Sequence, residues 1–238
     1  MIHLRKKGIM VIGNGLVANA FESYRHNKDV VVFASGVSNS SNKDTAEFAR
    51  ESNLLKLHLS QYKNRLFVYF STCAIYDPIL QTSMYVQHKK AMEQLIADNH
   101  NNYCIFRISN IAGKTENPNT ILNYLYQHIR EVKSFVLWEG AERNIIDVED
   151  AFYLCDTIIK NTSGIGQNIY DIANIHNYRV ETIVKEIECH IAKKGNYTVI
   201  PKHSRPHIPM TGMDLLQDTL YSIFTSDYLK KVIQKYYS

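Results

Sequence analysis

The chain has 238 residues, and its 27 lysines and arginines outnumber its 23 aspartates and glutamates to give a net charge of +4. Charges of both signs are mixed along most of the sequence, so composition requires neither a nucleic acid nor a membrane partner. The four cysteines form no C-x-x-C pair, which argues against a zinc knuckle or a disulfide framework. No run approaches the ~20 apolar residues of a membrane span. We expect a cytoplasmic protein without a metal site.

Short apolar runs alternate with longer amphipathic stretches over the first 160 residues, which is typical of a parallel α/β sheet with flanking helices. The predicted strands are Gly8–Ile12, Val30–Ala34, Leu66–Phe70 and Cys104–Ile108. The predicted helices, each long enough to cross back over a sheet, are Leu16–Arg25, Lys43–Leu57, Tyr85–Asn99, Pro118–Val132 and Val148–Asn161.

The pattern changes after about residue 160. Two short strands, Ile169–Ile172 and Thr198–Ile200, surround a helix over Val180–Lys193, and a proline-containing loop follows at His203–Pro209. We therefore expect a main domain over residues 1–160 and a small cap over residues 161–238.

The first predicted strand runs into a glycine turn, Gly13-Asn14-Gly15-Leu16-Val17-Ala18, which opens the first helix. Glycines let the chain turn tightly and approach a pyrophosphate, so strand, G-x-G-x-x-A and helix predict a Rossmann-like dinucleotide or related phosphate site. A plain tight turn is the alternative. The acidic residue that should follow about 20 positions later is absent, because that zone reads Val32-Phe33-Ala34-Ser35-Gly36.

A second polar segment follows the third predicted strand, where Thr72 ends the strand and Tyr85 and Lys89 open the next helix. Tyr and Lys at i and i+4 share one helix face, so we expect the ammonium to lower the pKa of the phenol toward neutral pH. The Thr hydroxyl would form a hydrogen bond with the reacting carbonyl or alcohol. These three residues are the predicted catalytic trio, and His88 between them is expected to be exposed.

Three further segments carry a family resemblance: Phe106–Gly113 is similar to an L-R-x-x-N-x-x-G strand, Arg143–Asp150 to R-x-x-I-x-V-x-D, and Ser204-Arg205-Pro206 with Asp214 to a late R-P…D element. Together with the glycine turn and the trio, they resemble the extended short-chain dehydrogenase/reductase superfamily. The resemblance is to its NAD-dependent epimerase/dehydratase branch, which processes nucleotide sugars.

The resemblance implies NAD or NADP as cofactor, a nucleotide sugar as substrate, and interleaving of the cofactor-binding part with the substrate cap. A homodimer through the helix that carries the Tyr-Lys pair is expected on the same ground. The substrate-binding residues implied are Thr72, Asn110, Arg143 and Arg205. The cofactor-binding residues implied are Gly13, Asn14, Gly15, Leu16, Val17, Ala34, Ser35, Gly36, Ser71, Tyr85, Lys89 and Ile108.

The sequence departs from the family at three places, and one of them is the short loop Pro78–Met84, where the family carries a longer loop over the active site. Val30–Asn39 aligns by resemblance with the family's fourth strand, so strands 2 and 3 are expected to be missing, and with them one wall of the adenosine pocket. Cys73 and Ala74 stand where sugar 4,6-dehydratases carry an Asp-Glu pair, which argues against dehydration.

Two reactions need only the trio: reduction of a nucleotide-activated 4-keto sugar, with Tyr85 as proton donor, and 4-epimerisation. Epimerisation requires a tightly retained cofactor, whereas a shortened pocket suits a cofactor that dissociates, so reduction is preferred. A non-catalytic Rossmann-like binding protein is the third hypothesis.

Overall fold

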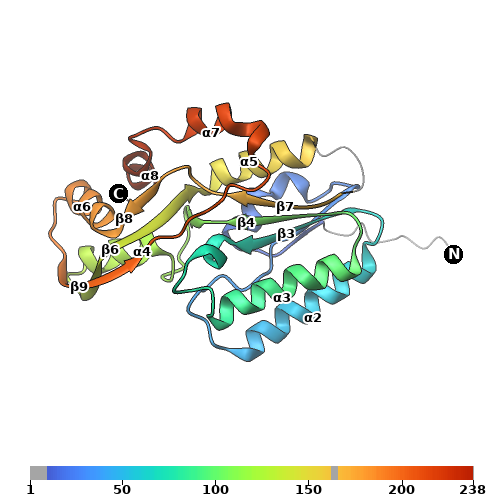
Figure 1. Cartoon of the computed structure of the whole chain (residues 1–238), viewed down its shortest axis with the longest axis horizontal. Helices are drawn as coiled ribbons and strands as arrows, with labels where there is room; N and C mark the ends of the chain where they lie inside the picture. The colour runs from blue at the N-terminus through green and yellow to red at the C-terminus, as the bar shows by residue number, and fades with distance from the viewer. Residues whose placement is uncertain (1–9, 162–165, 238) are drawn as a thin grey trace.

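The computed structural model describes residues 10–161 and 166–237. Its centre is a five-stranded parallel sheet in the order β1-β2-β3-β4-β7 (Figure 1). The strands are β1 (Val11–Ile12), β2 (Val30–Phe33), β3 (Leu66–Thr72), β4 (Tyr103–Ile108) and β7 (Gln167–Ile172).

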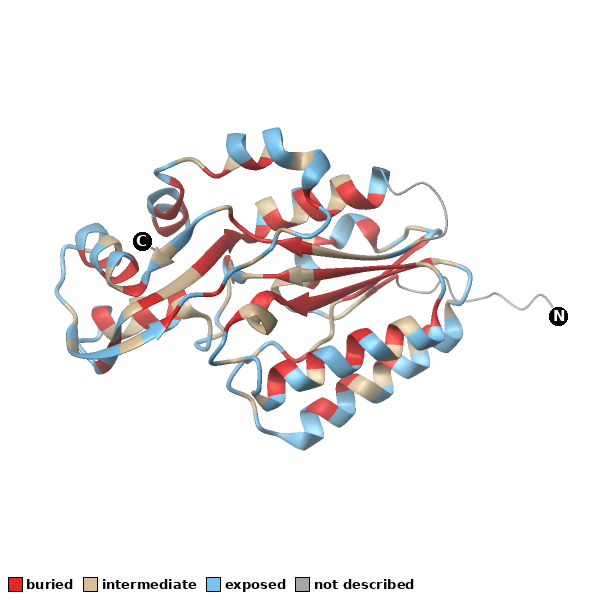
Figure 2. Ribbon diagram, viewed as in Figure 1, coloured by how far each residue is buried: buried red, intermediate tan, exposed pale blue. Residues whose placement is uncertain are grey.

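Helices cover both faces of this sheet. On one face lie α2 (Thr45–Gln61) and α3 (Met84–Asn99), and on the other lie α1 (Leu16–Ala20) and α5 (Val148–Asn161) (Figure 1). Successive side chains of a strand point to opposite faces. In β3, accordingly, Phe67 and Tyr69 join the apolar cluster beneath α2 and α3, while Val68 and Phe70 join the cluster on the other face. Figure 2 shows the strands of this sheet as predominantly buried.

A smaller sheet extends from the carboxyl side of the main one. Its strands are β5 (Asn110–Ala112), β6 (Ser134–Asp147), β8 (Asn177–Arg179) and β9 (Asn196–Ser204). The long strand β6 pairs in parallel with β5 and β9 and antiparallel with β8. The remaining elements are η1 (Glu22–Tyr24), η2 (Cys73–Tyr76), α4 (Ile121–Arg130), α6 (Val180–His190), η3 (Asp214–Leu216), α7 (Gln217–Ile223) and α8 (Tyr228–Tyr236).

The predicted α/β class and Rossmann-like arrangement are confirmed, and so is the shortening of the sheet. β1 pairs directly with β2, through Val11 with Val32 and Ile12 with Phe33. In the described residues, no strand lies on the other side of β1. Positions 8 and 9 of the first predicted strand lie outside the described residues.

The prediction beyond residue 110 was less complete. The sequence analysis predicted neither β5 as a separate strand nor the 14-residue strand β6. The strand predicted at 198–200 is longer, covering Asn196–Ser204. Over residues 10–161 and 166–237, no helix is both long and apolar enough to cross a membrane.

Candidate active site

Thr72 and Tyr85 meet at the carboxyl end of β3. Thr72 is the last residue of β3 and caps η2, where its Oγ1 accepts a hydrogen bond from the Ala74 amide at 3.1 Å. Tyr85 lies in the first turn of α3, which begins after the N-cap Ser83. The two side chains are close enough for the Thr72 hydroxyl to lower the pKa of Tyr85. Both side chains belong to buried residues, so the pair is largely withdrawn from bulk water.

Burial governs the ionisation of Tyr85. It raises the pKa of the phenol, the hydrogen bond with Thr72 lowers it, and the charge of Glu51 raises it, with a net value of about 12. The phenol is therefore protonated at neutral pH. The expectation that Lys89 would bring this pKa toward neutrality was wrong for the free protein, because the ammonium is compensated by Glu51.

Lys89 follows Tyr85 by one turn of α3 and is buried, with 3% of its side chain exposed. Its Nζ donates to Glu51 Oε1 at 3.0 Å, to the Tyr69 hydroxyl at 3.1 Å and to the Phe70 carbonyl at 3.3 Å. An ammonium has three protons. Three protein acceptors therefore match its full donor capacity.

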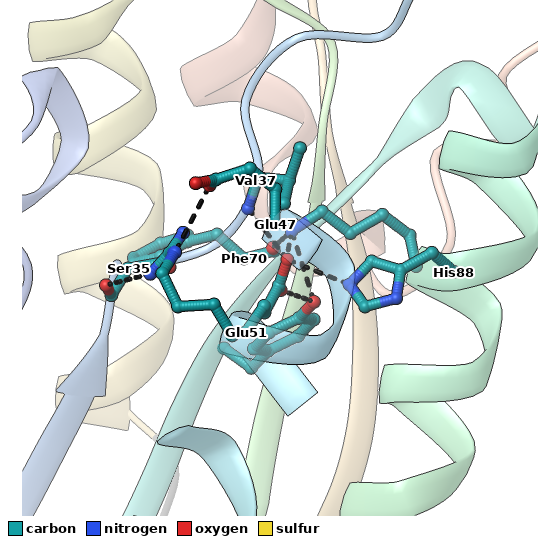
Figure 3. A network of polar contacts seen from close by, with 9 residues as sticks. Ser35, Val37, Glu47, Glu51, Phe70 and His88 are labelled. Carbon is teal, nitrogen blue, oxygen red and sulfur yellow. Dashed lines mark hydrogen bonds and ion pairs between the residues drawn. The ribbon is translucent and has the colours of Figure 1, made fainter. Parts of the chain in front are cut away.

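Glu51 lies on α2 and is completely buried (Figure 3). Its Oε1 also accepts from the Tyr69 hydroxyl at 2.6 Å, and its Oε2 accepts from the Val37 amide at 2.7 Å and contacts His88 Nε2 at 3.0 Å. Burial by itself would raise the pKa of this carboxyl. The charge of Lys89 and the hydrogen bonds outweigh burial and bring the pKa to about 2.

The glycine turn lies against the same region. Gly13 has φ +130°, and a Cβ there would lie 2.4 Å from the Ala34 carbonyl oxygen, so only glycine allows this approach of β1 to the end of β2. At Gly36, two residues after Ala34, a Cβ would lie 2.5 Å from Lys89 Nζ. Close contacts therefore join the glycine turn to the segment from Ala34 to Gly36, and join this segment to Lys89.

The site offers polar groups that suit a dinucleotide. Ser71 Oγ is buried at the end of β3 without a hydrogen-bond partner, and a Cβ on Gly15 would meet nothing within 4 Å, which leaves open space over the turn. Ile108 ends the neighbouring strand β4 and is buried. These residues fit the nicotinamide and phosphate parts of a dinucleotide. On the adenosine side, the described residues provide no strand beyond β1.

The other predicted cofactor residues lie around the turn. Leu16 and Val17 begin α1, and the Leu16 side chain would touch a Cβ placed on Gly113. Asn14 lies between the two glycines of the turn. Ser35 accepts hydrogen bonds from Arg50 through its carbonyl at 3.2 Å and its hydroxyl at 3.3 Å. Their roles toward a cofactor stay predictions.

Two of the three predicted substrate residues outside the trio lie on paired strands, Asn110 on β5 and Arg143 on β6. The Asn110 side-chain amide donates to the Asn144 carbonyl at 2.7 Å, next to Arg143. Arg143 is half-buried and donates to Ser204 Oγ at 3.4 Å, and Ser204 in turn donates to Asp77 Oδ2 at 2.8 Å. Asp77 directly follows η2, so this chain of contacts joins Arg143 to the segment that begins at Thr72.

Arg205 is more weakly held. Its side chain is 56% exposed, and its Nε lies 3.5 Å from Glu142 Oε1. Burial lowers the pKa of Arg143, which the charge of Asp77 partly offsets. Planar guanidinium donors bind a diphosphate well, and the role of Arg143 and Arg205 toward a diphosphate stays a prediction. In the described part of the chain, no group of three or more His, Cys, Asp or Glu residues could hold a metal ion.

Sequence reasoning missed three residues of the site: Glu51, Tyr69 and His88. The prediction that His88 is exposed was wrong, since 9% of its side chain is accessible and its ring stacks on Phe48 with the centroids 4.6 Å apart. Glu51 is separated from Lys89 by 38 positions and lies in a helix whose other charged residues are exposed. No local pattern marks such a residue as buried.

The fold and this arrangement of Thr, Tyr and Lys define a Rossmann-like protein of the short-chain dehydrogenase/reductase type. The model of the NAD dependent epimerase/dehydratase family matches residues 11–173, and the chain belongs to that family. No match was found among curated protein sequences.

Solved structures share the fold at low sequence identity. The dTDP-4-dehydrorhamnose reductase of Bacillus anthracis, in complex with NADP, has a TM-score of 0.69 and 14% identity, over 92% of this chain and 85% of that one. The UDP-glucose 4-epimerase of Thermus thermophilus, in complex with NAD, has a TM-score of 0.65 and 13% identity, over 93% and 82%. The dTDP-glucose 4,6-dehydratase of Bacillus anthracis, with NAD, has a TM-score of 0.66 and 18% identity, over 93% and 76%.

Proposed function

We propose that this protein is an NAD(P)H-dependent reductase of a nucleotide-activated 4-keto sugar, with Tyr85 as the proton donor. The observation that carries the proposal is the meeting of Thr72, at the end of β3, with Tyr85, in the first turn of α3, one helical turn from the buried Lys89. The Tyr85 phenol carries a proton at neutral pH that it can give to a carbonyl oxygen, and because its pKa is about 12, this transfer depends on stabilisation of the phenolate by a nearby positive charge.

The chain's own residues divide the work of such a reaction. The Thr72 hydroxyl holds the substrate carbonyl oxygen beside Tyr85. The Tyr85 O–H gives its proton to that oxygen as the carbonyl becomes an alcohol, and the positive charge of Lys89 stabilises the phenolate left behind. Arg143 and Arg205 bind the diphosphate, with Asn110 near the sugar. The reduced nicotinamide cofactor, when bound, supplies the hydride to the carbonyl carbon.

The known relatives support a cofactor and a substrate class. Three similar solved structures are complexes with NAD or NADP, and each of those enzymes is named for a nucleotide-linked sugar. For this chain, NAD or NADP is proposed, held more weakly on its adenosine side because β1 is the edge of the sheet in the described residues. A cofactor that dissociates after each turnover suits a reductase better than an epimerase.

The domain division belongs to the same proposal. Residues 1–160 would hold the cofactor, and residues 161–238 would form the substrate cap. Strand β6 from the first part joins the small sheet and β7 from the second part completes the main sheet, which agrees with interleaved parts. A homodimer is also proposed, and light scattering of the purified protein tests it.

The test is the substitution Tyr85→Phe, which removes one hydroxyl and keeps the ring. We expect the wild type to oxidise NADH or NADPH in the presence of a UDP- or dTDP-linked 4-keto sugar. The variant should lose at least about 100-fold in kcat while it retains cofactor affinity. Consumption of cofactor at equal rates by both proteins would contradict the role of Tyr85, and interconversion of 4-epimers without net cofactor consumption would favour the 4-epimerase.

One observation favours a second candidate, a non-catalytic Rossmann-like binding protein. The three acceptors of Lys89 are all protein groups, so no proton of its ammonium is free for a ligand in this structure. A binding protein would tolerate this arrangement, whereas an enzyme must exchange one of the three contacts when its cofactor arrives. Ligand affinity together with undetectable turnover in the wild type would support the binding protein.

A further inference from the structure

Glu51 is a buried carboxylate that sequence reasoning leaves without a role. It has no exposed surface, although it stands on a helix whose neighbouring charged residues Glu47 and Arg50 reach solvent. Burying a charged carboxylate is costly unless a counter-charge and hydrogen bonds compensate it. The groups that compensate the buried charge of Glu51 therefore indicate its role.

Two of the partners of Glu51, Lys89 and Tyr69, also contact each other. Lys89 Nζ lies 3.0 Å from Glu51 Oε1, and the Tyr69 hydroxyl contacts both, at 2.6 Å from the carboxylate and 3.1 Å from the ammonium. The ion pair thus has a shared third member that bridges its two charges. This closed triangle fixes the position of the Lys89 nitrogen relative to β3.

The loop after β2 closes over the ion pair. The Val37 amide donates to Glu51 Oε2 at 2.7 Å, and Gly36 passes so close that a Cβ there would lie 2.5 Å from Lys89 Nζ and 2.9 Å from Glu51 Oε1. With 3% of the Lys89 side chain exposed, bulk water does not solvate the ammonium. Its charge therefore depends on the carboxylate beside it.

We propose that Glu51 is the positioning residue of the proposed active site: as the buried counter-ion of Lys89, it keeps the ammonium charged and fixed one helical turn from Tyr85. The inference rests on the proposed function for its catalytic consequence, but the charge relation between the two residues can be measured without substrate. Glu51 acts through Lys89 and touches no reacting atom.

The charged and titratable groups around Lys89 come from three elements. Burial lowers the pKa of Lys89, Glu51 and Glu93 oppose that effect, and Arg50 adds to it. Of the two carboxylates, Glu51 contacts the ammonium directly, whereas Glu93 forms its ion pair with Arg107 at 2.6 Å. The full set is Glu51 and Arg50 on α2, Tyr69 on β3, and Tyr85, His88 and Glu93 on α3.

The direct test follows the ionisation of Lys89 by NMR in protein labelled with 13C at lysine Cε, with the Lys89 signal assigned by its loss in Lys89→Met. In the wild type, we expect Lys89 to stay charged throughout the neutral range. In Glu51→Gln, which keeps the shape of the side chain and removes its charge, Lys89 should lose its proton at a distinctly lower pH.

The matched control is Glu47→Gln, the same change one turn away on α2 at an exposed carboxylate. Its Lys89 signal should titrate as in the wild type. If Lys89 of Glu51→Gln also titrates as in the wild type, the proposal is overturned, whatever the protein's activity.

A double variant covers the case in which Glu51→Gln does not fold. Combining it with Lys89→Met removes both charges, so no uncompensated ammonium stays buried. We expect the double variant to be more stable than Glu51→Gln alone in urea denaturation. A double variant no more stable than the single one would contradict the counter-ion role.

Kinetics then separate this proposal from the proposed function. If the reductase is active, Glu51→Gln should lower kcat at neutral pH by at least about tenfold, leave the KM of the sugar nearly unchanged, and shift the pH profile. Glu51→Asp, which restores the charge, should recover part of the rate. No reductase activity in the wild type refutes the proposed function, while the NMR result still decides the counter-ion.

Discussion

Burial affects the protonation state of both ionisable residues of the trio, Tyr85 and Lys89. Tyr85 holds its proton at neutral pH because the phenolate would be poorly solvated, and Lys89 is charged beside a carboxylate in the interior. In the free protein, the positive charge available to a phenolate is therefore partly compensated. If a ligand replaces one of the Lys89 contacts, the positive charge that acts on the Tyr85 oxygen changes.

Acid should destabilise the protein through Glu51. Its pKa in the folded protein is about 2, against 4.5 for an ordinary Glu, so its ionised form stabilises the fold above about pH 4.5. This contribution is lost as the pH falls from about 4.5 through about 2. Urea denaturation at a series of pH values should show the loss in the wild type.

In Glu51→Gln the same series should be flatter over that acid range, because the variant has no carboxyl to protonate at this position. The exposed variant Glu47→Gln should follow the wild-type curve. Parallel curves for the wild type and Glu51→Gln would show that Glu51 contributes no acid-labile stability.

At the residue scale, the sequence was informative where chemistry and local spacing coincide. The i, i+4 spacing of Tyr85 and Lys89 predicted a shared helix face, and both residues are buried on α3. The burial of Glu51 and His88 could not be predicted, because it depends on α2 and α3 packing side by side over β3. That contact joins residues 37 and 38 positions apart.

At the scale of elements, the main sheet and most of its flanking helices were predicted more accurately than the small sheet, while the helix predicted over Leu16–Arg25 ends at Ala20. The helix over Val148–Asn161 has the predicted bounds, and α2 and α3 differ from prediction by a few residues at most. In β6, polar residues and Gly140, with φ +76°, interrupt any regular alternation. Val136 is also apolar yet exposed, which hides the alternation of its buried neighbours.

Capping of α3 should affect both stability and the site. Ser83 Oγ accepts a hydrogen bond from the Val86 amide at 3.2 Å at the start of the helix that carries Tyr85. Ser83→Ala should lower the free energy of unfolding by about 1 kcal/mol. Because the lost bond is two residues from Tyr85, turnover should fall as well.

Thr120→Ala is the matched control, since Thr120 Oγ1 caps α4 by accepting from the Asn123 amide at 3.4 Å, away from the trio. It should cost a similar free energy in urea denaturation and leave turnover unchanged. An equal loss of turnover in both variants would show that α3 capping has no specific effect on the site.

At the scale of the whole molecule, the sheet is shorter than the family pattern. β1, with two residues, has β2 on one side and no partner on the other within the described residues. The glycine turn at its end thus lies at the edge of the sheet, where a cofactor's adenosine has fewer protein groups to contact. The resemblance of Val30–Asn39 to the family's fourth strand predicted this feature from the sequence.

Calorimetric titration of the wild-type protein with NAD, NADH, NADP and NADPH tests the central claim most directly. The account predicts that at least one of the reduced forms binds, with a dissociation constant below about 1 mM, and that the heat is lost when Gly13→Val blocks the approach to Ala34. If none of the four binds at about 1 mM, the trio of Thr72, Tyr85 and Lys89 does not serve an NAD(P)-dependent reaction.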